Sequence, residues 1–169
     1  MHRQRAQTLR GFLITMTQML RSRPSFPLII VLLAAGLSAC VVDVTGVNGE
    51  LESARARWAA NQPSAYEVTV RTLCFCIENR PVIVAVRAGA IESRRYADTG
   101  LAIDPRFASL FPAVEGLFAV VDDAVARHAA QLDVQYDAVR GFPVRISIDY
   151  IKNAVDDEIV YLVSDFTVR

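Results

Sequence analysis

Apolar residues recur at two different spacings after residue 50, and each spacing predicts a type of secondary structure. Leu51, Ala54 and Trp58 recur at the spacing that lines one face of a helix, and Asn48 stands where an N-terminal cap is expected. The Asn-Gln-Pro-Ser segment at 61–64 carries the turn residues that end such a helix. The chain therefore predicts a short first helix that begins near residue 50.

A second helix is the most regular element in the sequence. Its apolar residues line a single helical face, and they are Val114, Leu117, Phe118, Val121, Val125 and Ala129. Pro112 suits the first turn, because a proline there forfeits no helical hydrogen bond. The preceding segment, residues 97–111, holds Gly100 and Pro105 and has no clear period, so we expect a loop that partly covers the sheet.

Alternation of apolar and polar residues predicts strands on both sides of the second helix. The expected strands cover residues 66–71, 82–87, 91–96, 132–136, 144–150 and 159–163. Ala88-Gly89 marks a hairpin between the second and third of them. The strands at 66–71 and 144–150 each keep one polar face, which is typical of an antiparallel sheet with one solvated side.

The order of these elements predicts the fold class. A helix followed by three strands, repeated once, indicates an α+β fold in which two helices pack on one face of an antiparallel β-sheet. The repeated order is also compatible with two related halves. Residues 50–169 are expected to form a single domain of this kind, and the alternating strands and helices of a nucleotide-binding βαβ fold are absent.

The first 39 residues have the layout of a signal peptide. Arg21 and Arg23 precede an apolar run at 26–36, which is followed by the small residues Ser38 and Ala39. The run is shorter than the roughly 20 residues that span a bilayer, so a permanent transmembrane helix is disfavoured. The residues before Arg21 exceed what a signal peptide needs, and later methionines suggest an over-extended start.

The segment Leu37-Ser38-Ala39-Cys40 resembles the bacterial lipobox. That resemblance implies that Cys40 becomes the mature N-terminus and carries lipid, which tethers the protein to a membrane. Residues 40–49 then form the lipidated cysteine and a spacer. Val41 stands where an aspartate would retain the protein at the inner membrane, so a periplasm-facing position on the outer membrane is favoured in a Gram-negative cell.

Charge is distributed unevenly along the chain. Residues 1–39 hold five arginines and no acidic residue, whereas the whole chain has a formal net charge of zero. The part that follows Cys40 is therefore acidic, and nucleic acid is not an expected partner.

Cys74 and Cys76 are the only thiols left once Cys40 is lipidated. An even pair in an oxidising compartment points to a disulfide, although Cα atoms two residues apart in a regular strand lie about 6.6 Å apart, so the strand end has to bend. Free buried thiols and a redox or metal role are the alternatives. A metal site is disfavoured, because the sequence after Cys40 contains one histidine, His128, and no methionine.

Four carboxylates gather near the last predicted turn. They belong to Asp149, Asp156, Asp157 and Glu158. Calcium takes six to eight oxygen ligands, so a cation site is conceivable here, but the spacing matches no known calcium loop. Such residues commonly fill a solvated turn, where Asp156 or Asp157 is expected to accept hydrogen bonds from backbone amides and fix the hairpin.

The sequence contains no recognisable catalytic motif. His128 has no serine or cysteine partner in a catalytic arrangement, and no glycine-rich loop suited to phosphate is present. A pair of carboxylates from Asp149 and the 156–158 group has nothing that positions a sugar or water between them. No catalytic residue and no cofactor is therefore expected.

A set of short motifs carries a family resemblance. They are Tyr66 with Cys74-Phe75-Cys76, Pro81-Val82, Gly116-Leu117-Phe118, Tyr136-Asp137, Gly141-Phe142-Pro143, Ile148-Asp149-Tyr150 and Asn153-Ala154-Val155-Asp156-Asp157-Glu158. Together they resemble a family of bacterial, often lipid-anchored proteins known only as a domain of unknown function. More loosely, the order of elements is similar to periplasmic modules of the protease-propeptide and β-lactamase-inhibitor kind, which bind other proteins.

These observations lead to one main expectation and two alternatives. The main expectation is a non-enzymatic envelope lipoprotein, held to the membrane by its lipid anchor, whose domain presents a sheet face or a loop to another protein or to envelope material. The first alternative is a thiol-active or redox-responsive protein that uses Cys74 and Cys76. The second is a calcium-binding module at the 149–158 turn.

Overall fold

The structure, a computed structural model, describes residues 44–169. The helical elements are α1 (Val44–Asn61), the 3-10 helix η1 (Pro105–Leu110) and α2 (Val114–Ala126). The strands are β1 (Ala65–Leu73), β2 (Val82–Arg87), β3 (Ala90–Tyr96), β4 (Gln131–Tyr136), β5 (Pro143–Asp149) and β6 (Ile159–Val168). The predicted signal peptide and Cys40 lie outside the described residues.

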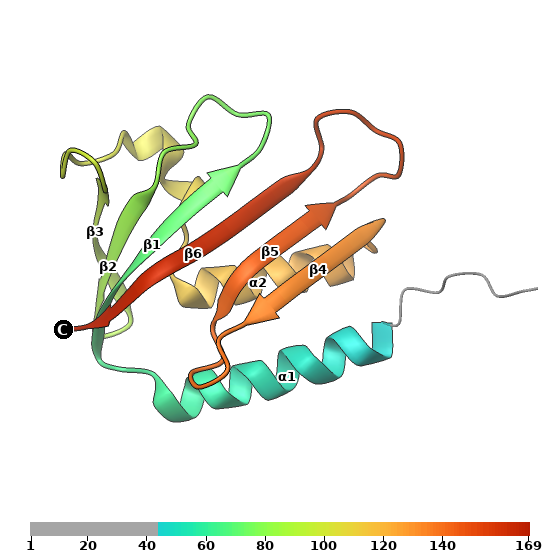
Figure 1. The fold of residues 1–169 in the computed structure, drawn as a ribbon, viewed down its shortest axis with the longest axis horizontal. Helices are drawn as coiled ribbons and strands as arrows, with labels where there is room; N and C mark the ends of the chain where they lie inside the picture. The colour runs from blue at the N-terminus through green and yellow to red at the C-terminus, as the bar shows by residue number, and fades with distance from the viewer. Residues whose placement is uncertain (1–43) are drawn as a thin grey trace, which may run out of the picture. The chain divides into compact units, whose positions relative to one another are not determined.

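The strands form one six-stranded sheet in the order β3-β2-β1-β6-β5-β4, and every neighbouring pair is antiparallel. Two hairpin-connected groups of three strands therefore meet where the first strand, β1, pairs with the last, β6 (Figure 1). The prediction of an α+β fold built on an antiparallel sheet is confirmed.

Helix α1 begins earlier than the sequence predicts. It starts at Val44, so Asn48 is inside the helix rather than at its cap, and residues 44–49 are helical rather than an irregular spacer. The predicted spacer contains Gly46 and Gly49, and glycine is a poor helix former. An interior glycine costs a helix only about 1 kcal/mol relative to alanine, a cost that burial of the apolar face of α1 offsets.

Helix α2 ends earlier than predicted. It stops at Ala126, and His128 follows with a left-handed backbone (φ +54°), so the prediction that the helix extends to Ala129 is wrong. The Ala129 amide donates to the Ala124 carbonyl and the His128 amide to that of Val125, which is the Schellman pattern of a helix C-terminus. Glycine usually occupies this left-handed position after a helix. Because histidine stands there instead, the sequence carries no clear signal for the helix end. Pro112 lies just before the helix, whose N-cap is Ala113.

The predicted 97–111 loop contains a short helix of its own. Asp104 caps η1 by accepting a hydrogen bond from the Arg106 amide. Ile103 and Phe111, on either side of η1, are buried in the core. The segment thus contributes to the core as well as connecting β3 to α2.

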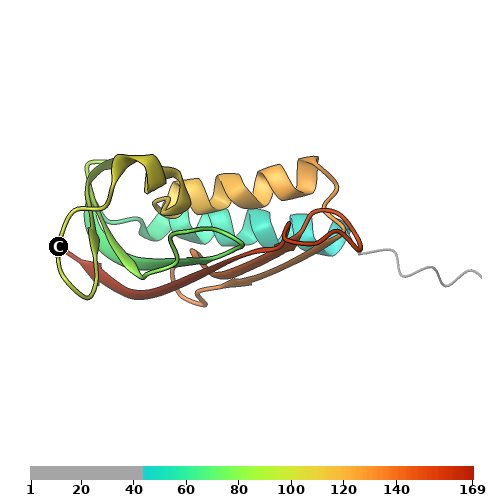
Figure 2. The ribbon, with the colours of Figure 1, turned by 90° about the horizontal axis from the view of Figure 1, so that it is seen from above.

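One hydrophobic core unites both helices with the sheet. Alternate residues of the central strands contribute to it, among them Val68, Val84, Ile146 and Val163, and α2 packs on β4 and β5 (Figure 2). Helix α1 adds Trp58, whose ring meets Tyr66, Phe142 and Phe166 edge-on with centroids 5.5 to 6.0 Å apart. These aromatic contacts hold the C-terminal part of α1 against one end of the sheet.

Candidate functional site

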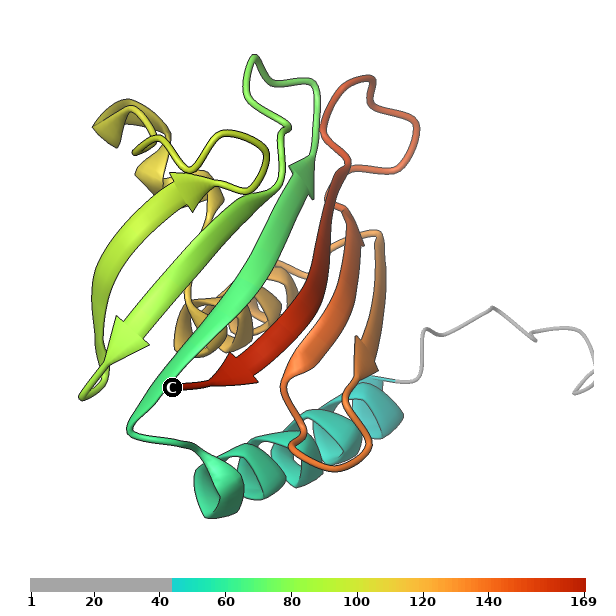
Figure 3. The same ribbon diagram turned by 60° about the vertical axis from the view of Figure 1, so that its left-hand side comes forward.

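Two loops lie side by side at one end of the sheet. Residues 74–81 connect β1 to β2, and residues 150–158 connect β5 to β6. Because Leu73 at the end of β1 pairs with Val160 near the start of β6, both loops leave the sheet at the same end (Figure 3). We call residues 74–81 and 150–158 the tip.

The tip brings together the two candidate sites that the sequence analysis treated separately. Cys74 and Cys76 lie in its first loop, and Asp156, Asp157 and Glu158 lie in its second. Asp149, the remaining candidate in the described residues, is the last residue of β5 and borders the second loop. Apart from Cys40, every candidate residue therefore lies at this end of the sheet.

Apolar side chains project from both loops of the tip. Phe75 is 82% exposed, Ile77 94%, Ile151 62% and Val155 83%. Residues 74–77 also line an open hollow on the surface. These side chains are not among the candidates predicted from the sequence, because an apolar residue in a short loop gives no periodic signal for exposure. Exposed apolar side chains gathered at one end of a domain are typical of interaction surfaces.

Cys74 and Cys76 form a disulfide in the first loop. Their Cα atoms are 5.1 Å apart, closer than in a regular strand, because β1 ends at Leu73 and the chain bends over residues 74–77. Both cysteines are half-buried. The Sγ atom of Cys76 lies 3.3 Å from the Glu78 carbonyl oxygen, a contact rather than a hydrogen bond because a disulfide sulfur carries no proton.

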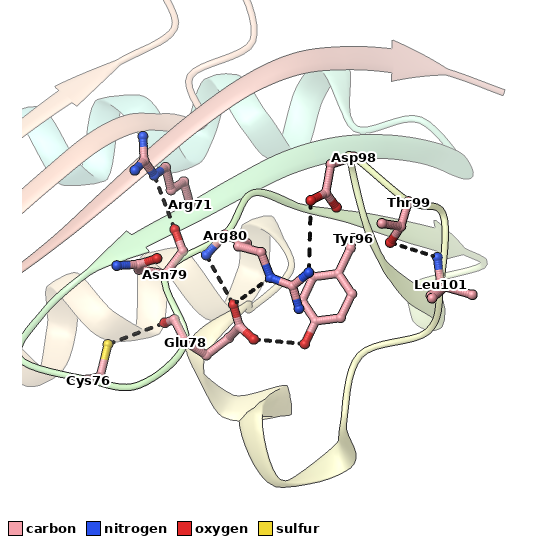
Figure 4. Close-up of polar contacts among 9 residues, drawn as sticks. All are labelled: Arg71, Cys76, Glu78, Asn79, Arg80, Tyr96, Asp98, Thr99 and Leu101. Atoms are coloured by element: carbon pink, nitrogen blue, oxygen red, sulfur yellow. Dashed lines mark hydrogen bonds and ion pairs between the residues drawn. The ribbon is translucent and has the colours of Figure 1, made fainter.

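A buried carboxylate fastens the base of this loop. Glu78 is only 7% exposed, and its Oε2 accepts a hydrogen bond from the Tyr96 hydroxyl at 2.8 Å (Figure 4). Its Oε1 accepts from the Arg80 amide at 3.1 Å and from the Arg80 Nε at 3.4 Å. The Arg80 guanidinium lies 3.5 Å from the centre of the Tyr96 ring, and 3.8 Å from Asp98. Strand β3 thereby holds the loop that leads into β2.

The pKa of Glu78 reflects opposing influences. Burial raises it, but the hydrogen bonds from Tyr96 and from the backbone and side chain of Arg80 favour the charged form and lower the pKa below its ordinary value. The same carboxylate raises the pKa of the Tyr96 hydroxyl, mainly through their hydrogen bond. The network is therefore a charged anchor at neutral pH.

Neighbouring contacts extend this anchor. The Nε of Arg71 in β1 donates to the Asn79 carbonyl at 3.1 Å, which ties the loop back to its own strand. On the other side, the Leu101 amide donates to the Thr99 hydroxyl at 3.4 Å, next to Asp98 (Figure 4). Phe75 and Ile77 thus project from a loop whose base is held by β1 and β3.

The second loop of the tip is held by acidic side chains. The Ile151 amide donates to Asp149 Oδ1 at 3.1 Å and to Asp157 Oδ2 at 2.7 Å. Asp157 thus accepts a hydrogen bond from a backbone amide of its own turn, as the sequence predicts for Asp156 or Asp157. Asn153 and Asp156 adopt left-handed backbone conformations, with φ of +65° and +70°.

Within residues 44–169, no three side chains of histidine, cysteine, aspartate or glutamate converge as a metal site would require. Two of the carboxylates that suggested a calcium site, those of Asp149 and Asp157, instead accept hydrogen bonds from the Ile151 amide. In the same part of the chain, no helix combines the length and apolar character needed to cross a membrane.

Comparison with known proteins identifies the family. Residues 50–168 match the family described as "Family of unknown function (DUF6174)". The chain belongs to the DUF6174 family. This confirms the predicted resemblance to a family of unknown function, and both loops of the tip fall inside the matched DUF6174 region. No curated protein and no solved structure matches the chain.

Proposed function

We propose that this protein is an envelope lipoprotein, anchored by lipid on Cys40, whose α+β domain is a non-enzymatic binding module that engages an envelope component through the tip. The observation that carries the proposal is the exposure of Phe75 and Ile77, each more than four-fifths exposed, on a loop fastened by Glu78.

Apolar side chains on a fastened loop favour binding over chemistry. Such side chains supply contact area that is desolvated on association, but they neither donate nor accept protons. A loop already held in place by Glu78 and Arg71 loses less conformational freedom when a partner binds, which strengthens association. The tip has both properties.

The arrangement of layers supports the same function. Leu51 and Trp58 of α1 belong to the same buried cluster as Leu117 and Val121 of α2, so we place both helices on one face of the sheet. The two groups of three strands, each preceded by a helix, are then two related halves joined through β1 and β6. This layering leaves the loops at the sheet end free to meet a partner.

A photo-crosslinking amino acid tests the binding surface in living cells. Introduced at Val155 in the tip, it is expected to give crosslinked products of the full chain. The matched control is Val139, a 70% exposed valine between β4 and β5 at the opposite end of the sheet. Equal crosslinking from both positions, or none from Val155, would contradict a specific role for the tip.

The anchor has a separate test. The mature protein extracted from membranes should have the mass of residues 40–169 plus diacylglycerol and a further acyl chain. Cys40→Ser should remove the lipid and release the protein from the membrane fraction. A mature protein without an acyl group would exclude the lipoprotein proposal.

The half-buried disulfide supports a second candidate function, that of a redox-responsive protein. In this function the Cys74–Cys76 bond takes up two electrons and two protons from a cellular dithiol, which is oxidised to its disulfide, and leaves two free thiols. Alkylation and mass measurement after equilibration in graded dithiol buffers tests it. A bond that persists until the domain unfolds would exclude this function.

A further inference from the structure

The position of the tip relative to α1 suggests what the tip meets. Only residues 41–43 separate Cys40 from Val44, the first residue of α1. A fully extended chain spans at most roughly 3.6 Å per residue, so a lipid on Cys40 holds the start of α1 within about 14 Å of the attachment point. Whatever lies near the start of α1 is therefore kept near the leaflet.

The start of α1 lies toward the tip end of the sheet. Glu50, in the first half of α1, lies beside Leu132 and Asp133, and the neighbouring first residue of β4 pairs with the last residue of β5 at the tip end. The last residue of α1 leads through residues 62–64 to the start of β1, at the opposite end. Helix α1 therefore starts nearer the tip end of the sheet, beside β4, and runs toward the opposite end (Figure 1).

The chemistry of the tip suits a zwitterionic leaflet better than an anionic one. Its four exposed apolar side chains come from two projecting loops, and the sulfurs of Cys74 and Cys76, on either side of Phe75, are bonded to each other. The 150–158 loop carries one basic residue, Lys152, against Asp156, Asp157 and Glu158. This balance favours zwitterionic headgroups and opposes anionic ones.

From these observations we infer that the tip docks on the leaflet that carries the Cys40 anchor and inserts Phe75, Ile77, Ile151 and Val155 among its lipids. The inference rests on the proposed lipid anchor. A tethered domain samples its own leaflet at a high effective concentration, so even a weakly apolar tip remains bound there. Acylation and the tip then act as two membrane signals on one chain.

A fluorescent probe at two matched positions tests the inference. The mature, acylated protein is prepared as Val155→Cys or Val139→Cys, labelled with an environment-sensitive nitrobenzoxadiazole, and reconstituted in phosphatidylcholine and phosphatidylethanolamine vesicles. Lipids with a nitroxide high on the acyl chain should quench the probe at 155 severalfold more than the probe at 139. Part-replacement by phosphatidylglycerol should lower the quenching at 155.

Further variants separate insertion from simple proximity. Phe75→Ser with Ile77→Ser, in the Val155→Cys background, should abolish the quenching at 155 without altering the circular dichroism spectrum, because both side chains are exposed. A serine at Val139 is the control and should leave the quenching unchanged. Persistence of the quenching in the double variant would overturn the inference.

The remaining outcomes distinguish the inference from the function on which it rests. If the acylated protein floats with the vesicles while the probe at 155 stays in water, the anchor stands and the inference is overturned. Crosslinks in cells that join Val155 to a protein and never to lipid would also overturn it. A mature chain without acyl groups would overturn the anchor and the inference together.

Discussion

Gly141 is a point of close approach between the β4–β5 connection and α1. Its backbone is left-handed (φ +83°), and a Cβ atom added there would collide with the Ala54 carbonyl oxygen of α1. Phe142, the next residue, is 4% exposed and stacks on Phe166 with centroids 4.8 Å apart. The Gly-Phe-Pro motif is thus explained by packing between the β4–β5 connection and the helix.

Gly141→Ala should therefore destabilise the domain by about 2–4 kcal/mol, since it adds a backbone penalty and a clash with α1. Gly89→Ala is the control, because Gly89 has a similar left-handed backbone (φ +75°) but no atom within 4 Å of the added carbon. That variant should lose only about 1 kcal/mol. Urea unfolding measures both, and equal losses would contradict the close approach.

Glu78 gives the tip a pH dependence whose direction follows from its lowered pKa. The charged form is favoured in the folded state, so its contribution to stability is complete above the ordinary pKa of 4.5 and disappears as the pH falls through the lower folded value. Glu78→Gln should thus lower the free energy of unfolding by about 1–3 kcal/mol at neutral pH. This difference should vanish in acid.

The measurement is urea unfolding of both proteins from pH 7 to pH 3. Glu92→Gln is the control, because Glu92 is exposed on β3 and its ion pair within residues 44–169 is with the exposed Arg87. Its effect should stay within about 0.5 kcal/mol. A Glu78→Gln effect that grows as the pH falls would contradict the assignment of the charged form.

Residue identity revealed part of the tip from the sequence. Cysteines and clustered carboxylates are recognisable by type, and they led to both loops. Phe75 and Ile77 were missed, because apolar residues are normally assigned to a core and only the structure shows them exposed. Glu78 and Tyr96 were missed for another reason: they meet across 18 positions of sequence, and no local pattern encodes that contact.

At the scale of elements, the disulfide restrains a very short segment. Cys74 and Cys76 are two positions apart, so the bond closes a three-residue loop and removes little freedom from the unfolded chain. Cys74→Ser with Cys76→Ser should therefore cost only about 1–2 kcal/mol of stability. Amide exchange should speed up over residues 74–80, and exchange in β1 itself should change little.

Hydrogen exchange with mass spectrometry on the variant checks this expectation. Reduced wild-type protein is the control and should match the double serine variant. Faster exchange throughout β1 and β6 would show instead that the bond supports the centre of the sheet.

Strand positions followed well from alternation, whereas several element ends did not. Strand β6 continues to Val168, beyond the predicted end at 163. Its register with β1 shifts between Glu67 and Thr69, and Asp165 has a left-handed backbone (φ +53°). This bulge interrupts the period of two on which the prediction depends, although Phe166 beyond it still packs on the core.

At the scale of the whole domain, the central pair β1 and β6 joins both ends of the sequence. Each central strand has partners on both sides, whereas β3 and β4 form the two edges of the sheet. Amides of β1 and β6 should accordingly exchange only on global unfolding, and those of β4 by local opening. Exchange of β4 as slow as that of β1 would contradict this order.

The pairing of the first strand with the last also has a consequence for how the protein is made. Until β6 emerges, whether from the ribosome or from a secretion channel, β1 has β2 on one side and an open edge on the other. Any chain stalled or clipped before residue 159 therefore exposes a strand ready to join another molecule. Quality control of this protein consequently depends on β6, and a premature stop before or within this strand should produce an aggregating species rather than a shortened working one.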